Sequence, residues 1–173
     1  MTQGTRNILI LDDEPNIGKA LSRLLKRENY NTIVCDDPHK ALGILKTTPV
    51  DLVISDNLMP QMTGLEFLKL VHDRHPHVLR VMLTGHADMQ TAIEGINQNE
   101  IYRFITKPWV HEEMLLMVSL AFEDIDTKKK ERELLAMARN QLVPQLEQKE
   151  ELEKEHPGIS KVRYDADGAI VIN

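Results

Sequence analysis

Cysteine, long apolar runs and a leader sequence are scarce or absent in this chain of 173 residues. The single cysteine, Cys35, cannot form a disulfide within the chain, and it ends an apolar stretch, so we expect a buried, unreactive thiol. No apolar run is long enough to cross a bilayer. The amino-terminal stretch MTQGTRNILILDDEP lacks the basic and apolar regions of a signal peptide. We therefore expect a cytoplasmic protein that does not bind membranes.

Positive charge is also in short supply. The chain has 21 lysines and arginines against 27 aspartates and glutamates, which gives a net charge of −6. Such a balance provides no long-range attraction for nucleic acid. The one basic run, at residues 128–130, is followed by Glu131 and Glu133, so we interpret it as a solvated helix face. We therefore expect no nucleic-acid binding.

Short apolar runs alternate with longer amphipathic stretches up to about residue 122. The apolar runs predict five strands, at residues 7–11, 30–35, 51–55, 80–84 and 102–106. The amphipathic stretches predict helices at residues 15–28, 38–46, 64–74 and 87–97, and a fifth that begins near Pro108. Because the strands are apolar on both faces and a helix fits into each connection, we expect an α/β fold with a doubly wound, five-stranded parallel sheet. The residues expected on the buried side of the first helix are Ile17, Ala20, Leu21, Leu24 and Leu25.

The composition changes after residue 122, where charged residues, glutamine and leucine become dominant. We predict a globular domain at residues 1–122, a charged helical extension at 123–156 that continues the fifth helix, and a short tail at 157–173. Leu135, Leu142 and Leu146 follow a heptad spacing, although charged residues at related positions and Pro144 interrupt it. Two alternatives stay open: a coiled coil that joins two copies into a homodimer, or a solvated helix packed on its own domain.

The tail contains two short alternating segments around a polar turn. Val162 and Tyr164 precede the turn, and Ile170 and Ile172 follow it, which predicts a small β-hairpin. The turn sequence Asp-Ala-Asp-Gly at residues 165–168 has the first ligands of a calcium loop, but the further oxygen ligands and the closing glutamate are missing. We therefore interpret it as a turn.

Polar or charged residues stand at the ends of four of the predicted strands. Asp12 and Asp13 follow the first strand, Asp56 the third, Thr84 ends the fourth, and Lys107 follows the fifth. In a doubly wound sheet the ligand site lies outside the carboxyl ends of the strands, so we expect these residues to meet around one pocket.

The residue types in this predicted pocket favour phosphoryl chemistry. Three neighbouring carboxylates repel one another and stay ionised only if a cation neutralises them, and oxygen ligands select a hard ion such as Mg²⁺. Lys107 can offset charge on an incoming phosphoryl group, and Thr84 can donate a hydrogen bond to it. Asp56 is then free to attack phosphorus in line and form a labile acyl phosphate.

Four motifs carry a resemblance to a known family. The stretches ILILDDEPN, VISDNLMPQMTGLEFL, VMLTGHAD and YRFITKPW, in this order, resemble the successive signatures of the bacterial response-regulator receiver domain, and the match covers about residues 6–122. The resemblance implies a flavodoxin-like receiver fold in which Asp56 is the phosphoacceptor. It also implies that Asp13, Asp56 and the carbonyl oxygen of Leu58 ligate Mg²⁺ directly, while Asp12 assists through water.

The same resemblance implies a switch. Thr84 is expected to move toward the phosphoryl group while Phe104 rotates inward behind it, which changes the surface of the fourth helix, fifth strand and fifth helix. The Lys107-Pro108 peptide bond is expected to be cis, and proline is the usual carrier of such bonds.

The implied function is that of a response regulator in a two-component phosphorelay. Its partners would be a histidine kinase or phosphotransfer protein and a downstream effector protein, and it would catalyse only its own phosphorylation and dephosphorylation. We expect no DNA-binding or catalytic output domain, because the residues after 122 contain no helix-turn-helix pattern and no phosphodiesterase motif.

Two other functions are less well supported by the sequence. A phosphatase of the haloacid-dehalogenase kind would place its nucleophile at the first strand with a second aspartate two residues later, whereas Asp12 and Asp13 are adjacent. A pseudo-receiver that never accepts phosphate would lack part of the set Asp12, Asp13, Asp56, Thr84 and Lys107, and all five residues are present.

Overall fold

The structure, a computed structural model, describes residues 5–85, 88–155, 163–164 and 170–171. Within these ranges, no helix is both long and apolar enough to span a membrane. The chain divides into two units, Met1–Phe122 and Glu123–Asn173. The predicted pocket residues all belong to the first unit.

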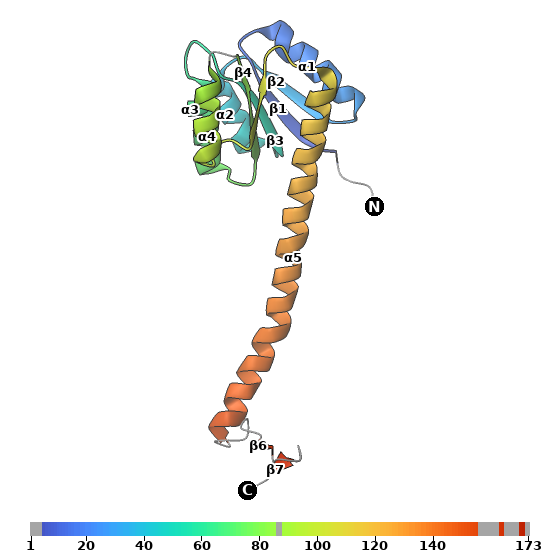
Figure 1. The fold of residues 1–173 in the computed structure, drawn as a ribbon, viewed down its shortest axis with the longest axis vertical. Helices are drawn as coiled ribbons and strands as arrows, with labels where there is room; N and C mark the ends of the chain where they lie inside the picture. The colour runs from blue at the N-terminus through green and yellow to red at the C-terminus, as the bar shows by residue number, and fades with distance from the viewer. Residues whose placement is uncertain (1–4, 86–87, 156–162, 165–169, 172–173) are drawn as a thin grey trace. The chain divides into compact units, whose positions relative to one another are not determined.

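A five-stranded parallel sheet forms the centre of the first unit, as predicted (Figure 1). The sheet order is β2-β1-β3-β4-β5. The strands are β1 (Asn7–Leu11), β2 (Asn31–Cys35), β3 (Leu52–Asp56), β4 (Leu79–Thr84) and β5 (Arg103–Thr106). The chain order reverses at β1 and β3, so the carboxyl ends of these two strands flank the expected ligand position.

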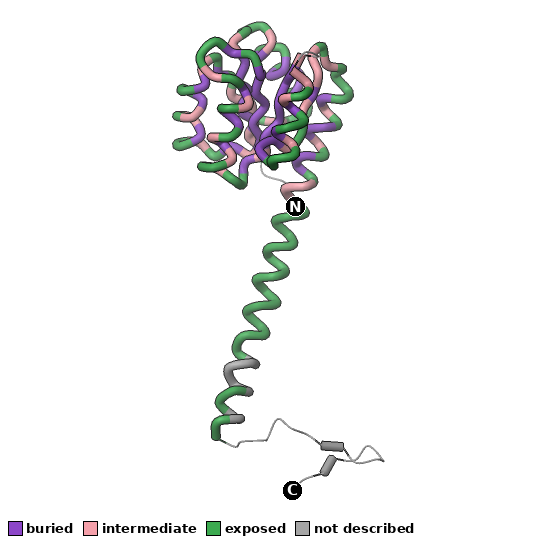
Figure 2. Tube along the Cα trace, turned by 60° about the vertical axis from the view of Figure 1, so that its left-hand side comes forward, coloured by how far each residue is buried: buried purple, intermediate pink, exposed green. Residues whose placement is uncertain are grey.

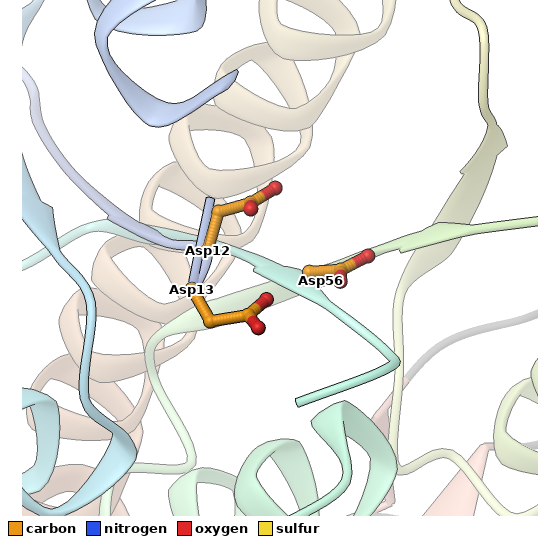
Figure 3. A group of neighbouring side chains, drawn as sticks. All are labelled: Asp12, Asp13 and Asp56. Carbon is orange, nitrogen blue, oxygen red and sulfur yellow. The ribbon is translucent and has the colours of Figure 1, made fainter. Parts of the chain in front are cut away.

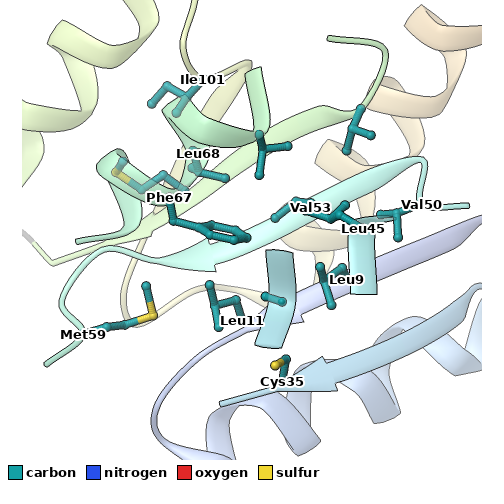
Figure 4. Packing of buried hydrophobic residues seen from close by; sticks show 14 of the residues in the cluster. Leu9, Leu11, Cys35, Leu45, Val50, Val53, Met59, Phe67, Leu68 and Ile101 are labelled. Carbon is teal, nitrogen blue, oxygen red and sulfur yellow. The ribbon is translucent and has the colours of Figure 1, made fainter. Parts of the chain in front are cut away.

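Helices cover both faces of this sheet (Figure 1). They are α1 (Pro15–Arg27), α2 (Pro38–Thr47), α3 (Gly64–Arg74), α4 (Met89–Asn97) and α5 (His111–Glu155). Buried residues of α2, α3 and α4 pack in one cluster with Leu9, Val53 and Met82 of the sheet, and Phe67 is its largest fully buried side chain (Figure 4). The opposite face of the sheet is covered by α1 and by the first turns of α5 (Figure 1).

The buried side of α1 differs from the prediction at one residue. Leu21, Leu24 and Leu25 are buried as expected, but Ala20 is exposed, and Gly18 and Ser22 are buried instead. At Gly18, α1 approaches β2 closely, because a Cβ at residue 18 would lie 2.8 Å from a side-chain carbon of Val34. Two small residues, Gly18 and Ser22, therefore face the sheet beside the three leucines.

The long helix α5 is 45 residues long and includes Pro144. Every residue from Thr127 to Pro144 is exposed, as the green part of Figure 2 shows, and these include Leu135 and Leu142 of the predicted heptad. A coiled coil between two copies stays a prediction. In the tail, β6 (Arg163–Tyr164) and β7 (Ile170–Val171) pair antiparallel, as the predicted hairpin requires, whereas the turn at 165–168 lies outside the described residues.

The start of α3 packs directly against the end of β3. Thr63 caps the helix: its hydroxyl accepts a hydrogen bond from the Glu66 amide at 3.2 Å, and the Glu66 carboxylate accepts one from the Thr63 amide at 2.9 Å. The Gly64 amide donates to the Asn57 carbonyl oxygen at 2.8 Å. A Cβ on Gly64 would lie 2.0 Å from the carbonyl oxygen of Asp56.

We expect Gly64→Ala to destabilise the fold by about 1–3 kcal/mol, because the backbone atoms that the new methyl group meets cannot move aside cheaply. Urea denaturation measures the change. The matched control is Gly43→Ala in α2, where a Cβ meets nothing within 4 Å and should stabilise the helix by up to about 1 kcal/mol. Equal effects of the two substitutions would contradict the packing described here.

Candidate functional site

Three carboxylates gather at the carboxyl edge of the sheet. Asp12 and Asp13 directly follow β1, and Asp56 is the last residue of β3, the neighbouring strand (Figure 3). One ligand oxygen from each lies within 4.8 Å of those of the other two. Asp12 is fully buried and Asp56 is 7% exposed, whereas Asp13 is half-buried. The sequence prediction that these three residues meet is therefore correct in its geometry.

Lys107 reaches this cluster from the end of β5. Its Nζ lies 2.8 Å from Asp56 Oδ1 and 3.1 Å from Asp12 Oδ2. Its backbone amide donates to the Thr84 carbonyl oxygen at 2.8 Å, and the Lys107-Pro108 bond is cis, as expected. The lysine therefore contacts two of the three carboxylates directly and offsets one of their negative charges.

The pKa values of the buried groups reflect this crowding. Burial raises the pKa of Asp12, and it outweighs the hydrogen bond from the Glu14 amide and the nearby charge of Lys107, both of which lower it. Burial also acts to lower the pKa of Lys107, but its hydrogen bonds and charge interactions with Asp56 and Asp12 are together stronger and raise that pKa. Lys107 therefore stays charged, while ionisation of Asp12 is costly.

The predicted switch residues lie on the two strands at the other side of Asp56. Thr84 ends β4 and is fully buried, and its hydroxyl donates to the carbonyl oxygen of the next residue, Gly85, at 3.2 Å. Phe104 in β5 is half-buried and packs against the core cluster. Phe104 pairs with Met82, two residues before Thr84, so both predicted switch side chains project from the same face of the sheet.

Leu58 lies just beyond the pocket, and its side chain is 62% exposed. The sequence-based interpretation overlooked the residue before it, Asn57. Asn57 is 4% exposed, and its Oδ1 is a buried atom without a hydrogen-bond partner among the described residues. One feature of the sequence could have pointed to Asn57. It comes directly after Asp56 in the run VISDN, where a polar residue continues an apolar strand.

The donor set fits a hard divalent cation. It consists of carboxylate oxygens within 4.8 Å of one another, with no sulfur or imidazole, which is the ligand type that Mg²⁺ prefers. Among the described residues, Lys107 forms ion pairs with Asp12 and Asp56 and not with Asp13. No contact with this lysine therefore competes with an ion for the Asp13 oxygens. An ion bound here would offset the repulsion that Lys107 leaves.

We expect Lys107→Met to destabilise the protein by about 3 kcal/mol at neutral pH, because it leaves the buried Asp12 and Asp56 without their cationic partner. Urea denaturation without divalent ions measures this. Lys40→Met is the control, since its contact with Asp36 at 3.7 Å joins two exposed side chains and should change stability little. A Lys107→Met protein as stable as the control would contradict a stabilising role for this lysine.

Comparison with known proteins places these features in a family. Residues 8–119 match the model of the response regulator receiver domain. Among curated proteins, the chain is 34% identical over 123 residues to the hydrogenase transcriptional regulatory protein HoxA of Cupriavidus necator, which covers 71% of this chain and 25% of that protein. It is 31% identical over 130 residues to the nitrogen assimilation regulatory protein NtrX of Azorhizobium caulinodans, covering 74% of this chain and 28% of that protein. The chain thus spans about a quarter of the length of these relatives.

Solved structures agree with this assignment. The signal receiver domain of an HD domain-containing protein from Pseudomonas fluorescens is 34% identical, with a TM-score of 0.70 and coverage of 75% of this chain and 96% of that one. NtrX from Brucella abortus is 28% identical, with a TM-score of 0.71 and coverage of 75% of this chain and 29% of that one. With the family model matched over most of the first unit and the acidic cluster at the expected sheet edge, the chain belongs to the response regulator receiver domain family.

Proposed function

We propose that this chain is the receiver of a two-component phosphorelay and that Asp56 accepts a phosphoryl group from a histidine kinase or a phosphotransfer protein. The observation that carries the proposal is the position of the Asp56 carboxylate, 2.8 Å from Lys107 Nζ and grouped with Asp12 and Asp13. Membership of the receiver family supports the same chemistry.

In the transfer step, one carboxylate oxygen of Asp56 forms a bond to phosphorus while the bond from phosphorus to the donor nitrogen of phosphohistidine breaks. The donor ring enters the step protonated on its other nitrogen, and the electron pair of the broken bond stays on the nitrogen that carried phosphorus, so the histidine leaves as the neutral ring. Lys107 is near enough to Asp56 Oδ1 to contact a phosphoryl oxygen attached there, and its raised pKa keeps it cationic throughout. The protein thus contributes position and charge, rather than an acid or a base.

The acidic cluster would hold Mg²⁺ through Asp13, Asp56 and the Leu58 carbonyl oxygen, with Asp12 assisting through water. When bound, the ion supplies Lewis-acid neutralisation of the phosphoryl oxygens. Asp12 is suited to an indirect role, because its Oδ1 already accepts the Glu14 amide at 2.9 Å and its Oδ2 the Lys107 ammonium.

The output would be a change in the shape of the surface formed by α4, β5 and α5. A phosphoryl group on Asp56 brings new acceptor oxygens next to Thr84, whose present bond to Gly85 is long at 3.2 Å and easily exchanged. Movement of Thr84 frees space on the sheet face from which Phe104 projects. Phosphorylation then favours the arrangement of Thr84 and Phe104 that makes the better contacts with the phosphoryl group.

We further propose that the chain catalyses only its own phosphorylation and dephosphorylation and acts in the cytoplasm through a downstream effector protein. The expectation that the protein has no DNA-binding or catalytic output domain stays a prediction, because the relatives are longer proteins matched over about a quarter of their length. The HoxA and NtrX relatives are named as regulators, which supports a regulatory role for this receiver.

Asp56→Ala should abolish labelling by radioactive acetyl phosphate in the presence of Mg²⁺, because no other carboxylate has the same contact with Lys107 and the same access. The label on the wild-type protein should be lost in hydroxylamine, as an acyl phosphate requires. Asp36→Asn, at an exposed site before α2, is the control and should label normally. Undiminished labelling of Asp56→Ala would place the acceptor elsewhere and refute the proposal.

Mg²⁺ should raise the melting temperature of the wild-type protein, because a ligand that binds only the folded state stabilises it in proportion to the logarithm of its concentration. Asp13→Asn should reduce this shift and raise the Mg²⁺ concentration needed for half-maximal labelling about tenfold or more, since it removes one charged ligand. A thermal scan across a MgCl₂ series, with Asp36→Asn alongside, provides the measurement. Identical shifts in all three proteins would argue against this metal site.

A further inference from the structure

Asn57 carries a buried amide whose hydrogen bonding is incomplete. The residue is 4% exposed, and its Oδ1 has no partner among the residues that the structure describes. A buried acceptor without a donor destabilises the state that contains it, because the oxygen has lost its water and gained nothing in return. An apolar side chain of the same size would avoid this cost. The asparagine therefore calls for an explanation in another state of the protein.

The backbone of Asn57 has no freedom to turn the side chain elsewhere. Its amide donates to the Leu83 carbonyl oxygen at 3.0 Å, and its carbonyl oxygen accepts the Gly64 amide at 2.8 Å. The Cα of Gly64 is so close that a Cβ there would lie 2.8 Å from Asn57 Cα. The side chain therefore keeps the face of the sheet that it takes one residue beyond the end of β3.

That face also carries Thr84. Asp56 and Leu83 form the last pair of the parallel ladder of β3 and β4, and the Asn57 amide donates to the Leu83 carbonyl oxygen of that pair. Asn57 and Thr84 each come directly after this last pair, on neighbouring chain segments about 4.8 Å apart, so the register brings the two residues side by side. The Thr84 hydroxyl at present only donates to the adjacent Gly85 carbonyl.

We propose that Asn57 is a positioning residue for Thr84 in the phosphorylated protein, an inference that rests on the proposed function. A hydroxyl has one hydrogen, and when Thr84 donates it to a phosphoryl oxygen, its own lone pairs are left to accept. A half-turn of the Asn57 amide about its Cβ–Cγ bond presents Nδ2 in place of Oδ1. The amide then donates to Thr84 Oγ1 and directs the threonine hydrogen at the phosphoryl group.

This arrangement biases the switch. The unpaired Oδ1 of Asn57 destabilises the unphosphorylated state, and in the phosphorylated state the half-turn moves Oδ1 out of that position as Nδ2 forms the new hydrogen bond, so the residue contributes a free-energy difference between the two states. If Asn57 were only an imperfect core residue, Asn57→Leu would stabilise the protein and leave its response to phosphate unchanged. The two roles therefore predict different results for one substitution.

The test is a double-mutant cycle of Asn57→Leu and Thr84→Val, read out by the affinity for beryllofluoride with Mg²⁺. The single tryptophan, Trp109, two residues after Lys107, provides a fluorescence signal for the titration. We expect Asn57→Leu to weaken beryllofluoride binding about fivefold in the wild-type background, the factor that corresponds to one ordinary hydrogen bond, without lowering the melting temperature. In the Thr84→Val background the same substitution should have no further effect.

Equal fivefold losses in both backgrounds, or no loss in the wild-type background, would overturn the inference. Asn57→Ala is carried through the same cycle in case the Asn57→Leu protein does not fold. Asn31→Leu, an exposed asparagine at the start of β2, is the matched control and should bind as the wild type does in either background. The proposed function is tested separately, because failure of the wild-type protein to label on Asp56 would refute that function. If the protein does label, additive effects of the two substitutions on beryllofluoride affinity would refute only the role of Asn57.

Discussion

Repulsion among Asp12, Asp13 and Asp56 is the constraint on which the rest of the domain depends. The three carboxylates lie within 4.8 Å of one another, and Asp12 has no contact with solvent. Side chains placed in this way separate unless the backbone that carries them is rigid. Here the backbone belongs to β1 and β3, which pair directly and are buried almost throughout, so the sheet core supplies the rigidity.

Lys107 balances only part of that repulsion, and this partial balance leaves the site suited to a divalent cation. With contacts of 2.8 and 3.1 Å to Asp56 and Asp12, the lysine holds the cluster together without an ion. Asp13, half-buried and outside those contacts, leaves an excess of negative charge that suits a divalent cation. A site neutralised completely by lysines would have little electrostatic attraction left for a divalent cation.

Much of this could be predicted from the sequence, because strand ends and sequence order define the pocket once the sheet is parallel. Asp12, Asp56, Thr84 and Lys107 each follow or end a recognisable apolar run. Asn57 could not be identified in this way, since its burial depends on the pairing of β3 with β4 and on the approach of Gly64. The same limit explains why the burial of Gly18 was not predicted, because periodicity ranks residues by apolarity and cannot show that α1 approaches β2 too closely for a larger side chain at that residue.

The hydrogen bonding of β4 differs at its two ends, and that difference indicates where the domain can change shape at least cost. At the amino end, Arg80 is buried, and its guanidinium donates to the carbonyl oxygens of Val78, Asn99 and Glu100 at 2.7, 3.2 and 2.7 Å. Lys69 pairs with the Glu100 carboxylate at 2.8 Å, which ties α3 to the same loop. Breaking these bonds would expose a buried charge and leave several acceptors unpaired.

The carboxyl end of β4 has no comparable network among the described residues. The Thr84 side chain has one long bond to its neighbour, Asn57 Oδ1 has no partner, and Asp88 at the start of α4 makes no capping bond with its side chain. In the proposed function, a phosphoryl group on Asp56 would act on the end of the strand where few bonds must be broken, while Arg80 would keep the loop after α4 attached. A charge added at this carboxylate would then shift one end of the helix without loosening the core.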